Sequence, residues 1–286
     1  MTIVDTRISE NALEAVFSAG QTRIVRSLAR PPVRFVQPQM GIGTALVFVS
    51  AFGGGMLEGD DYSFRIECRE GARLMFAPQA NTRVFPCPNG LATRQSIRGT
   101  VYAQATVVSG GDPTVLYGNS RFHQSQTWVL HPGARLAVMD WMVAGRLERG
   151  ENFDFDRFES EIRVENPEGL PLLSDRLLLC PADDRDAARA GMGGFSSHLA
   201  VYIMGPGWEA VHAGLENWLR AAQADTERPA WMHDCRIAGI GVREGRGFSL
   251  RALGRDRQAL EPLADKLFEL LGSEEWLGFD YWKRKY

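Results

Sequence analysis

Short alternating runs of hydrophobic and polar residues dominate the first 180 positions of the chain. In the run 62–68, Tyr62, Phe64 and Ile66 alternate with polar residues, which is the period of a strand with one buried face. Similar runs recur as far as residue 179 and are separated by turn-forming pairs such as Asn89-Gly90. Because no strong helical period interrupts them, the pattern predicts a large, mainly β body that is antiparallel, β-helix-like or multilayered.

The hydrophobic period changes in the last third of the chain. Residues 181–196 are polar and rich in glycine, which is typical of a mobile connection. A predicted strand at 198–204 then leads to a helix over 208–222, and a second helix ends at Gly272. We therefore expect three parts: a β-rich scaffold over 1–180, the connection over 181–196, and a smaller α+β part with two helices over 197–286, packed on the same body.

Composition and charge narrow the class of protein. The net charge of −3 over 286 residues lacks the basic excess of a nucleic-acid-binding protein. The four cysteines lie far apart, with no C-x-x-C pair, and no secretory signal or membrane-length apolar run is present. These features predict a cytoplasmic protein with reduced thiols, which binds neither nucleic acid nor membrane.

A turn rich in glycine and acidic residues lies between two predicted strands, at 53–61. Three consecutive glycines and a fourth at position 59 let the backbone adopt positive φ angles and approach a neighbour closely. Glu58, Asp60 and Asp61 crowd the same turn, and carboxylates this close repel unless a cation, a basic group or water separates them. The turn is therefore a candidate cation site, with a plain structural turn as the alternative.

Two further acids stand in hydrophobic runs. Asp140 follows Leu136 to Met139 and precedes Trp141, and Asp175 comes shortly after the apolar run 170–173. An ionised carboxylate in such surroundings is costly unless a partner or water reaches it. The structural explanation is a buried salt bridge to Arg146 or Arg176. The functional explanation is a polar site, although no Cys and His cluster offers a closed zinc site.

Four blocks, in order within residues 20–180, carry a family resemblance. They are Gly54 to Asp60; Gly71 to Leu74 with Pro78 to Phe85; Asp140-Trp141 with Gly145-Arg146 and Arg149-Gly150-Glu151; and Pro171 to Leu177. Together these blocks resemble the UreD family of urease accessory proteins, called UreH in some bacteria. Many bacterial members carry Leu-Pro-Gln-Glu or Leu-Pro-Gln-Asp where this chain has Leu116 to Asn119. The chain is similar instead to the fungal and plant branch.

The resemblance implies a non-enzymatic scaffold that binds apo-urease and, with UreF and the GTPase UreG, passes Ni²⁺ to the urease active site. It implies transient Ni²⁺ with no tightly bound cofactor, and homodimers only within the accessory complex. A carrier that must release Ni²⁺ should use sparse carboxylates, hydroxyls and water. By residue-wise match, the expected path residues are Glu58, Asp60, Thr82, Asp140 and Asp175. The candidate partner-binding residues are Arg146, Arg149 and Glu151, from a turn with charges of both signs, and Trp282, from the aromatic and basic C-terminal end.

Two alternatives from other classes stay open. A hydrolase on a β scaffold would use two of Asp60, Asp140 and Asp175 as general acid and base, which requires carboxyls about 5–10 Å apart on the floor of an open cleft. A β-rich module that binds sugars or proteins would need aromatic side chains at the surface. The candidates are Trp128, Trp141, Trp276, Tyr281 and Trp282, although most of them stand in apolar runs typical of a core.

Overall fold

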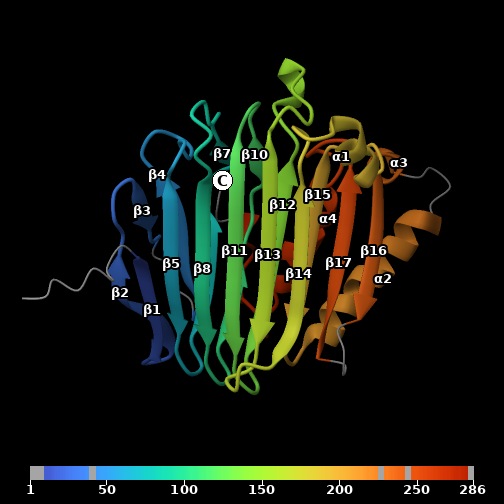
Figure 1. Ribbon diagram of the computed structural model, residues 1–286. Helices are drawn as coiled ribbons and strands as arrows, with labels where there is room; N and C mark the ends of the chain where they lie inside the picture. The colour runs from blue at the N-terminus through green and yellow to red at the C-terminus, as the bar shows by residue number, and fades with distance from the viewer. Residues whose placement is uncertain (1–9, 39–42, 225–228, 242–245, 283–286) are drawn as a thin grey trace, which may run out of the picture.

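The strands of the computed structural model, which describes residues 10–38, 43–224, 229–241 and 246–282, form two stacked sheets (Figure 1). Sheet A has the order β14 (Pro171–Leu179), β13 (Arg157–Glu165), β11 (Arg121–Leu130), β8 (Thr93–Val101), β5 (Asp61–Cys68), β1 (Asn11–Ser18) and β2 (Gln21–Leu28). Sheet B has the order β16 (Cys235–Gly241), β17 (Gly247–Gly254), β15 (Ser197–Met204), β12 (Arg135–Val143), β9 (Thr106–Ser109), β6 (Arg73–Pro78), β4 (Ala45–Ala51) and β3 (Val33–Val36). Two short strands, β7 (Thr82–Val84) and β10 (Thr114–Leu116), pair with each other, and β10 also pairs with β12.

Between β4 and β13 the chain winds as a solenoid. It passes alternately from one sheet to the other, so each coil adds one long strand to sheet A and one to sheet B, and two coils also carry the short strands β7 and β10 on the sheet B side. Neighbours within a sheet are therefore one coil apart and run parallel, as β5, β8, β11 and β13 do. The mainly β class and its β-helix-like form are confirmed. Antiparallel pairing is wrong for these central strands, because alternation reports which face is buried and not the direction of the neighbouring strand.

Antiparallel pairs close the two ends of the solenoid. At one end β1 pairs with β2 and β3 with β4, and at the other β13 pairs with β14. Strand β15 pairs antiparallel with β12, and β17 and β16 follow it, so strands from the 197–286 part extend sheet B. The division into a scaffold and an α+β part stays a prediction.

Both predicted helices are confirmed, as α2 (Trp208–Ala224) and α4 (Glu261–Leu271). The stretch expected to be a mobile connection contains a further helix, α1 (Arg185–Gly191), whose first turn is capped by the Asp184 carboxylate accepting from the Ala187 N–H. A short α3 (Ala230–His233) and a 3₁₀ turn, η1 (Leu147–Arg149), complete the helices of the described residues. None of these helices combines the length and apolarity that crossing a bilayer requires.

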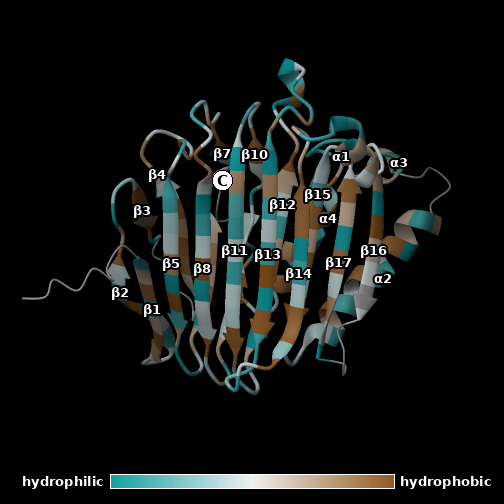
Figure 2. Ribbon diagram, in the orientation of Figure 1, coloured by the Kyte–Doolittle hydropathy of each residue, from teal (hydrophilic) through white to brown (hydrophobic). Residues whose placement is uncertain are grey.

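Two hydrophobic cores hold the layers together. The first lies between the sheets and includes Phe64, Phe76 and Trp128. The second lies between the outer face of sheet B and the helices α2 and α4. In β8 and β11 of sheet A, the first half of the strand is mainly hydrophilic and the last residue is hydrophobic (Figure 2). The polar side chains of these two strands therefore lie nearer the end at which each strand begins.

Candidate functional site

A row of polar side chains crosses the inner face of sheet A at one level. Tyr62 of β5 is in register with Gln95 of β8, which is in register with Gln124 of β11. Gln124 is in turn in register with Ser160 of β13. Since neighbouring strands lie about 4.8 Å apart, the in-register pairing places these side chains at regular steps across four strands. The sheet thus presents a polar row inside an otherwise apolar core.

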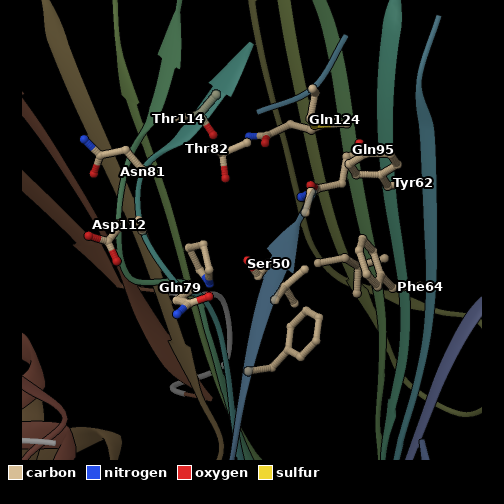
Figure 3. A pocket seen from close by; sticks show the side chains of 18 of the residues that line it. Ser50, Tyr62, Phe64, Gln79, Asn81, Thr82, Gln95, Asp112, Thr114 and Gln124 are labelled. Atoms are coloured by element: carbon tan, nitrogen blue, oxygen red, sulfur yellow. The ribbon is translucent and has the colours of Figure 1, made fainter. Parts of the chain in front are cut away.

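A cavity of about 210 Å³ lies beside this row, between the two sheets (Figure 3). Tyr62, Gln95 and Gln124 line it from sheet A. The facing polar groups come from sheet B and its loops: Gln79, Asn81, Thr82, Asp112, Thr114 and Asp140. Its described lining contains carboxylate, amide and hydroxyl groups but neither histidine nor cysteine. Such a lining offers oxygen ligands that bind a divalent transition ion weakly.

Asp140 is the buried carboxylate of this cavity. Its carboxylate accepts hydrogen bonds from Gln124 Nε2 at 2.6 Å and Ser160 Oγ at 2.5 Å, and the residue is 8% exposed. Burial raises the pKa of Asp140; these two hydrogen bonds oppose that effect, and the charge of Asp175 adds to it. No arginine partner is found among the described residues, so the structural explanation by a salt bridge is wrong for Asp140. Hydrogen bonds from sheet A hold this acid instead.

Asp175 has a different environment. Its carboxylate accepts from the Tyr202 hydroxyl and from the Arg251 guanidinium. An ion pair was expected here, but with Arg146 or Arg176. Arg251 stands 76 residues further along the chain and reaches Asp175 because β17 lies near β14 at the open edge of the sandwich. Asp175 does not line the cavity.

The acids of the glycine turn serve the turn and its neighbours. The Asp60 carboxylate accepts from the Leu57 N–H and from the Tyr62 hydroxyl, both at 2.8 Å. It therefore caps its own turn and fixes the first member of the polar row. Glu58 accepts from the backbone N–H groups of Asn89 and Leu91 and from the Asn89 side chain. Partial desolvation raises the pKa of Glu58, but these hydrogen bonds together outweigh it and the pKa is lowered.

The glycine turn itself approaches the cavity. Gly54 and Gly55 are among its lining residues. A Cβ added to Gly55 would lie 2.6 Å from the Phe85 ring and 2.7 Å from the Arg83 carbonyl oxygen. Close backbone packing therefore requires a glycine here, as the sequence pattern indicated.

Comparison with protein-family models and with known proteins identifies the relatives of this chain. The UreD urease accessory protein model matches residues 9–282. The chain belongs to this family. Urease accessory protein UreD of Cytophaga hutchinsonii is 31% identical over 277 residues, covering 95% of this chain and 96% of the relative. The UreD of Sorangium cellulosum is also 31% identical, over 96% of this chain and 83% of the relative.

A plant relative is more distant. Urease accessory protein D of Oryza sativa subsp. japonica is 25% identical over 216 residues, which cover 73% of this chain and 69% of the relative. The resemblance to the UreD family is thus confirmed. The closer affinity to the fungal and plant branch stays a prediction.

Three of the four blocks that resemble UreD converge on the cavity. The glycine turn supplies Gly54 and Gly55, the second block supplies Gln79 to Thr82, and the third supplies Asp140 and Trp141. The fourth block lies on β14 with Asp175. Of the five predicted path residues, Thr82 and Asp140 line the cavity. Asp60 contacts a lining residue, Tyr62, through a hydrogen bond. Glu58 binds the backbone of the neighbouring loop at Leu91, and Asp175 lies away from the cavity, paired with Arg251.

Sequence reasoning missed several polar groups of this UreD site. Asp112 lines the cavity after two glycines with φ angles of 127° and 149°, a stretch whose glycines and proline indicate a turn but no site. Gln124 occupies an inward position of β11 between Phe122 and Trp128. A polar residue at an apolar position of an alternating strand is the signal that could have found it.

The predicted partner-binding residues differ in exposure. Arg146 forms an ion pair with Glu151 and stacks over the Tyr117 ring at 4.2 Å, so both belong to the internal structure of their loop. Arg149 is exposed on η1, whose loop projects beyond the ends of the sheets (Figure 1). Trp282 is partly buried against Phe268. Of these four residues, Arg149 is the most accessible to another protein.

Proposed function

We propose that this chain is a urease maturation factor that binds apo-urease and, with UreF and the GTPase UreG, passes Ni²⁺ toward the urease active site. Ni²⁺ is the cargo and is held only in transit. The cavity between the sheets is the part of the chain through which we propose that the ion moves. Family membership supports the maturation role, and the chemistry of the cavity lining supports the transfer role.

The observation that carries the proposal is Asp140, a carboxylate held by neutral groups at the wall of a polar cavity. Gln124 and Ser160 donate to it, and no ion pair neutralises it within the described residues. A divalent cation would favour the ionised form of a carboxyl whose pKa burial has raised. With oxygen ligands and no imidazole among the described residues of the lining, the ion would be bound weakly enough to leave.

The hydrolase alternative is less well supported. Its expected pair was drawn from Asp60, Asp140 and Asp175, of which only Asp140 lines the cavity. Asp60 caps its turn and Asp175 is paired with Arg251. The aromatic-surface alternative also lacks support, because four of its five candidates are at most 3% exposed and the fifth is partly buried: Trp128, Trp141, Trp276 and Tyr281, and Trp282. The relatives named above are accessory proteins, in keeping with a non-enzymatic role.

The test is nickel loading of co-expressed urease at limiting nickel. Asp140→Asn keeps the size of the side chain and removes its charge, so it should lower the nickel content and activity of urease while the chain still folds. Asp186→Asn is the matched control, because this exposed acid lies on α1, outside the cavity lining. It should load urease as the wild type does.

A pull-down from the same cells separates the two halves of the proposal. Urease subunits, UreF and UreG should co-purify with the wild type and with both variants. Normal nickel loading by Asp140→Asn would refute transfer past this acid. Failure of urease to co-purify with the wild type would refute the maturation role itself.

A further inference from the structure

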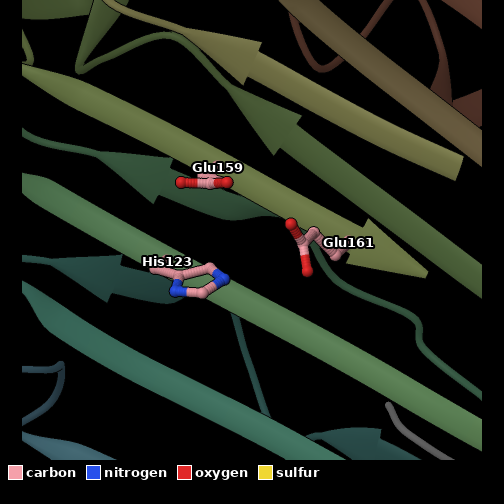
Figure 4. Close-up of side chains that lie close together, drawn as sticks. All are labelled: His123, Glu159 and Glu161. Carbon is pink, nitrogen blue, oxygen red and sulfur yellow. The ribbon is translucent and has the colours of Figure 1, made fainter. Parts of the chain in front are cut away.

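A second cluster of metal-ligating side chains lies on the outer face of sheet A, away from the cavity (Figure 4). His123 of β11 is in register with Glu159 of β13, and Glu161 follows two residues later on the same strand. Since Gln124 and Ser160 point inward, their neighbours His123, Glu159 and Glu161 point to the opposite face. One ring nitrogen of His123 and one carboxylate oxygen of each glutamate lie within 4.8 Å of one another.

The histidine has an unused, sheltered nitrogen. His123 Nε2 is screened from solvent and has no hydrogen-bond partner among the residues that the structure describes. A buried polar atom without a partner costs free energy, and a bound ion would remove that cost. The pairing of β11 with β13 fixes the backbone of all three residues, so only their side chains have to adjust to bring the three donors around one ion.

Glu159 is only 8% exposed, and two arginines hold its carboxylate: Arg157 donates to one oxygen and Arg176 to the other. Ion pairs of this kind favour the ionised carboxylate, which is the form that binds a cation.

Arginines compete with a metal for these acids. Arg176 is paired with Glu159 and with Glu161, and Arg157 is paired with Glu159. Arg94 lies in register with His123 on the other side. The Arg176 side chain is 58% exposed, however, so its guanidinium can move into solvent when an ion takes its place, while the Glu159 side chain, at 11%, stays sheltered.

We propose that His123, Glu159 and Glu161 form a binding site for a divalent transition-metal ion, and that the ion replaces Arg176. One imidazole and two carboxylates suit Zn²⁺, Co²⁺ or Ni²⁺, with water completing the coordination. Mg²⁺ and Ca²⁺ prefer oxygen ligands alone, so they should bind less well. This site is separate from the cavity, so a result that overturns it would leave the proposed transfer of Ni²⁺ through the cavity unaffected.

The test is calorimetric titration of the metal-free full chain with Zn²⁺, together with the visible absorption spectrum of added Co²⁺. His123→Ala and Glu161→Gln should each weaken binding by about tenfold or more, and should remove the Co²⁺ bands of this site. His131→Ala is the matched control, because this partly exposed histidine stacks on Tyr102 elsewhere in the chain. It should leave both readouts unchanged.

Arg176→Ala supplies a readout that an incidental site would not give. If the metal and Arg176 compete for the same carboxylates, removing the guanidinium should tighten Zn²⁺ binding by up to about fivefold. The proposal is overturned if His123→Ala keeps the wild-type affinity, stoichiometry and Co²⁺ spectrum. It is also overturned if the wild-type chain binds no Zn²⁺, or if Arg176→Ala weakens binding.

Discussion

Two substitutions at Asp140 separate its hydrogen bonds from its charge. Asp140→Ala removes the acceptor for Gln124 and Ser160, which are 6% and 3% exposed. Each buried donor left without a partner costs about 1–3 kcal/mol, so the loss is about 2–6 kcal/mol, and water from the adjacent cavity should bring it toward the lower end. Against a total stability of about 5–15 kcal/mol, this is a large share.

Asp140→Asn should behave differently. The amide oxygen can still accept from Gln124, and the amide nitrogen can donate to the Ser160 hydroxyl. The variant also removes a carboxylate that burial disfavours, so its free energy of unfolding at neutral pH should equal or exceed that of the wild type. Urea unfolding at pH 7 measures both variants. If the two lie within about 0.5 kcal/mol of each other, the hydrogen bonds to Asp140 do not stabilise the fold.

The pH dependence gives a second check on the same acid. Burial raises the pKa of Asp140 in the folded state, so its contribution favours the fold below the ordinary pKa of a carboxyl and is lost as pH rises through the raised value. Asparagine does not titrate. The stability of Asp140→Asn relative to the wild type should therefore grow from acid to neutral pH. A constant difference would contradict a raised pKa for this group.

Three other substitutions test single contacts. Asp60→Ala should lower the free energy of unfolding in urea by about 1 kcal/mol, because the Leu57 N–H and the Tyr62 hydroxyl lose their acceptor. The variant should also lower the nickel loading of urease; normal loading would mean that Asp60 serves the turn alone. Gly99→Ala should cost about 1–3 kcal/mol, since the new Cβ would lie 2.1 Å from the fully buried Trp128 ring; an unchanged melting temperature would contradict this packing. Burial, with the charge of Arg251, lowers the pKa of His198 from 6.5 to about 4. The free energy of unfolding of the wild type should therefore fall by about 3 kcal/mol as pH falls from 6.5 to 4, because only the unfolded state gains the proton. His198→Gln does not titrate and should lose less over the same range.

The fold could be predicted as far as local patterns determine it. The alternation of Tyr62, Phe64 and Ile66 correctly indicated a strand, and apolar residues at helical spacing indicated α2 and α4. The parallel direction of the central strands could not be derived from alternation, because it depends on each strand pairing one coil further along the chain. The helix α1 was missed because it is short, carries no apolar stripe and lies within a polar stretch that ends in several glycines; a side-chain cap at Asp184 sets its start.

The site was predictable where one motif carries several of its groups. The glycine turn and Thr82 were assigned to the site from sequence blocks, and both reach or adjoin the cavity. The partners of Asp140 were not predictable, because Gln124 and Ser160 stand on other strands 16 and 20 residues away. Likewise, Arg251 meets Asp175 only because the sheets bring β14 and β17 together.

The in-register coils limit how such a scaffold can change its span. Removing or duplicating one complete coil would delete or add one member of the polar row and leave the turns at both ends of the strands intact. The reach of the row would then change in whole steps of about 4.8 Å, never by a fraction of a step. A homologue with a longer or shorter polar row should therefore differ from this chain by entire coils. An insertion or deletion of one residue inside a strand should be rare, because it would turn the later side chains of that strand to the wrong face of the sheet.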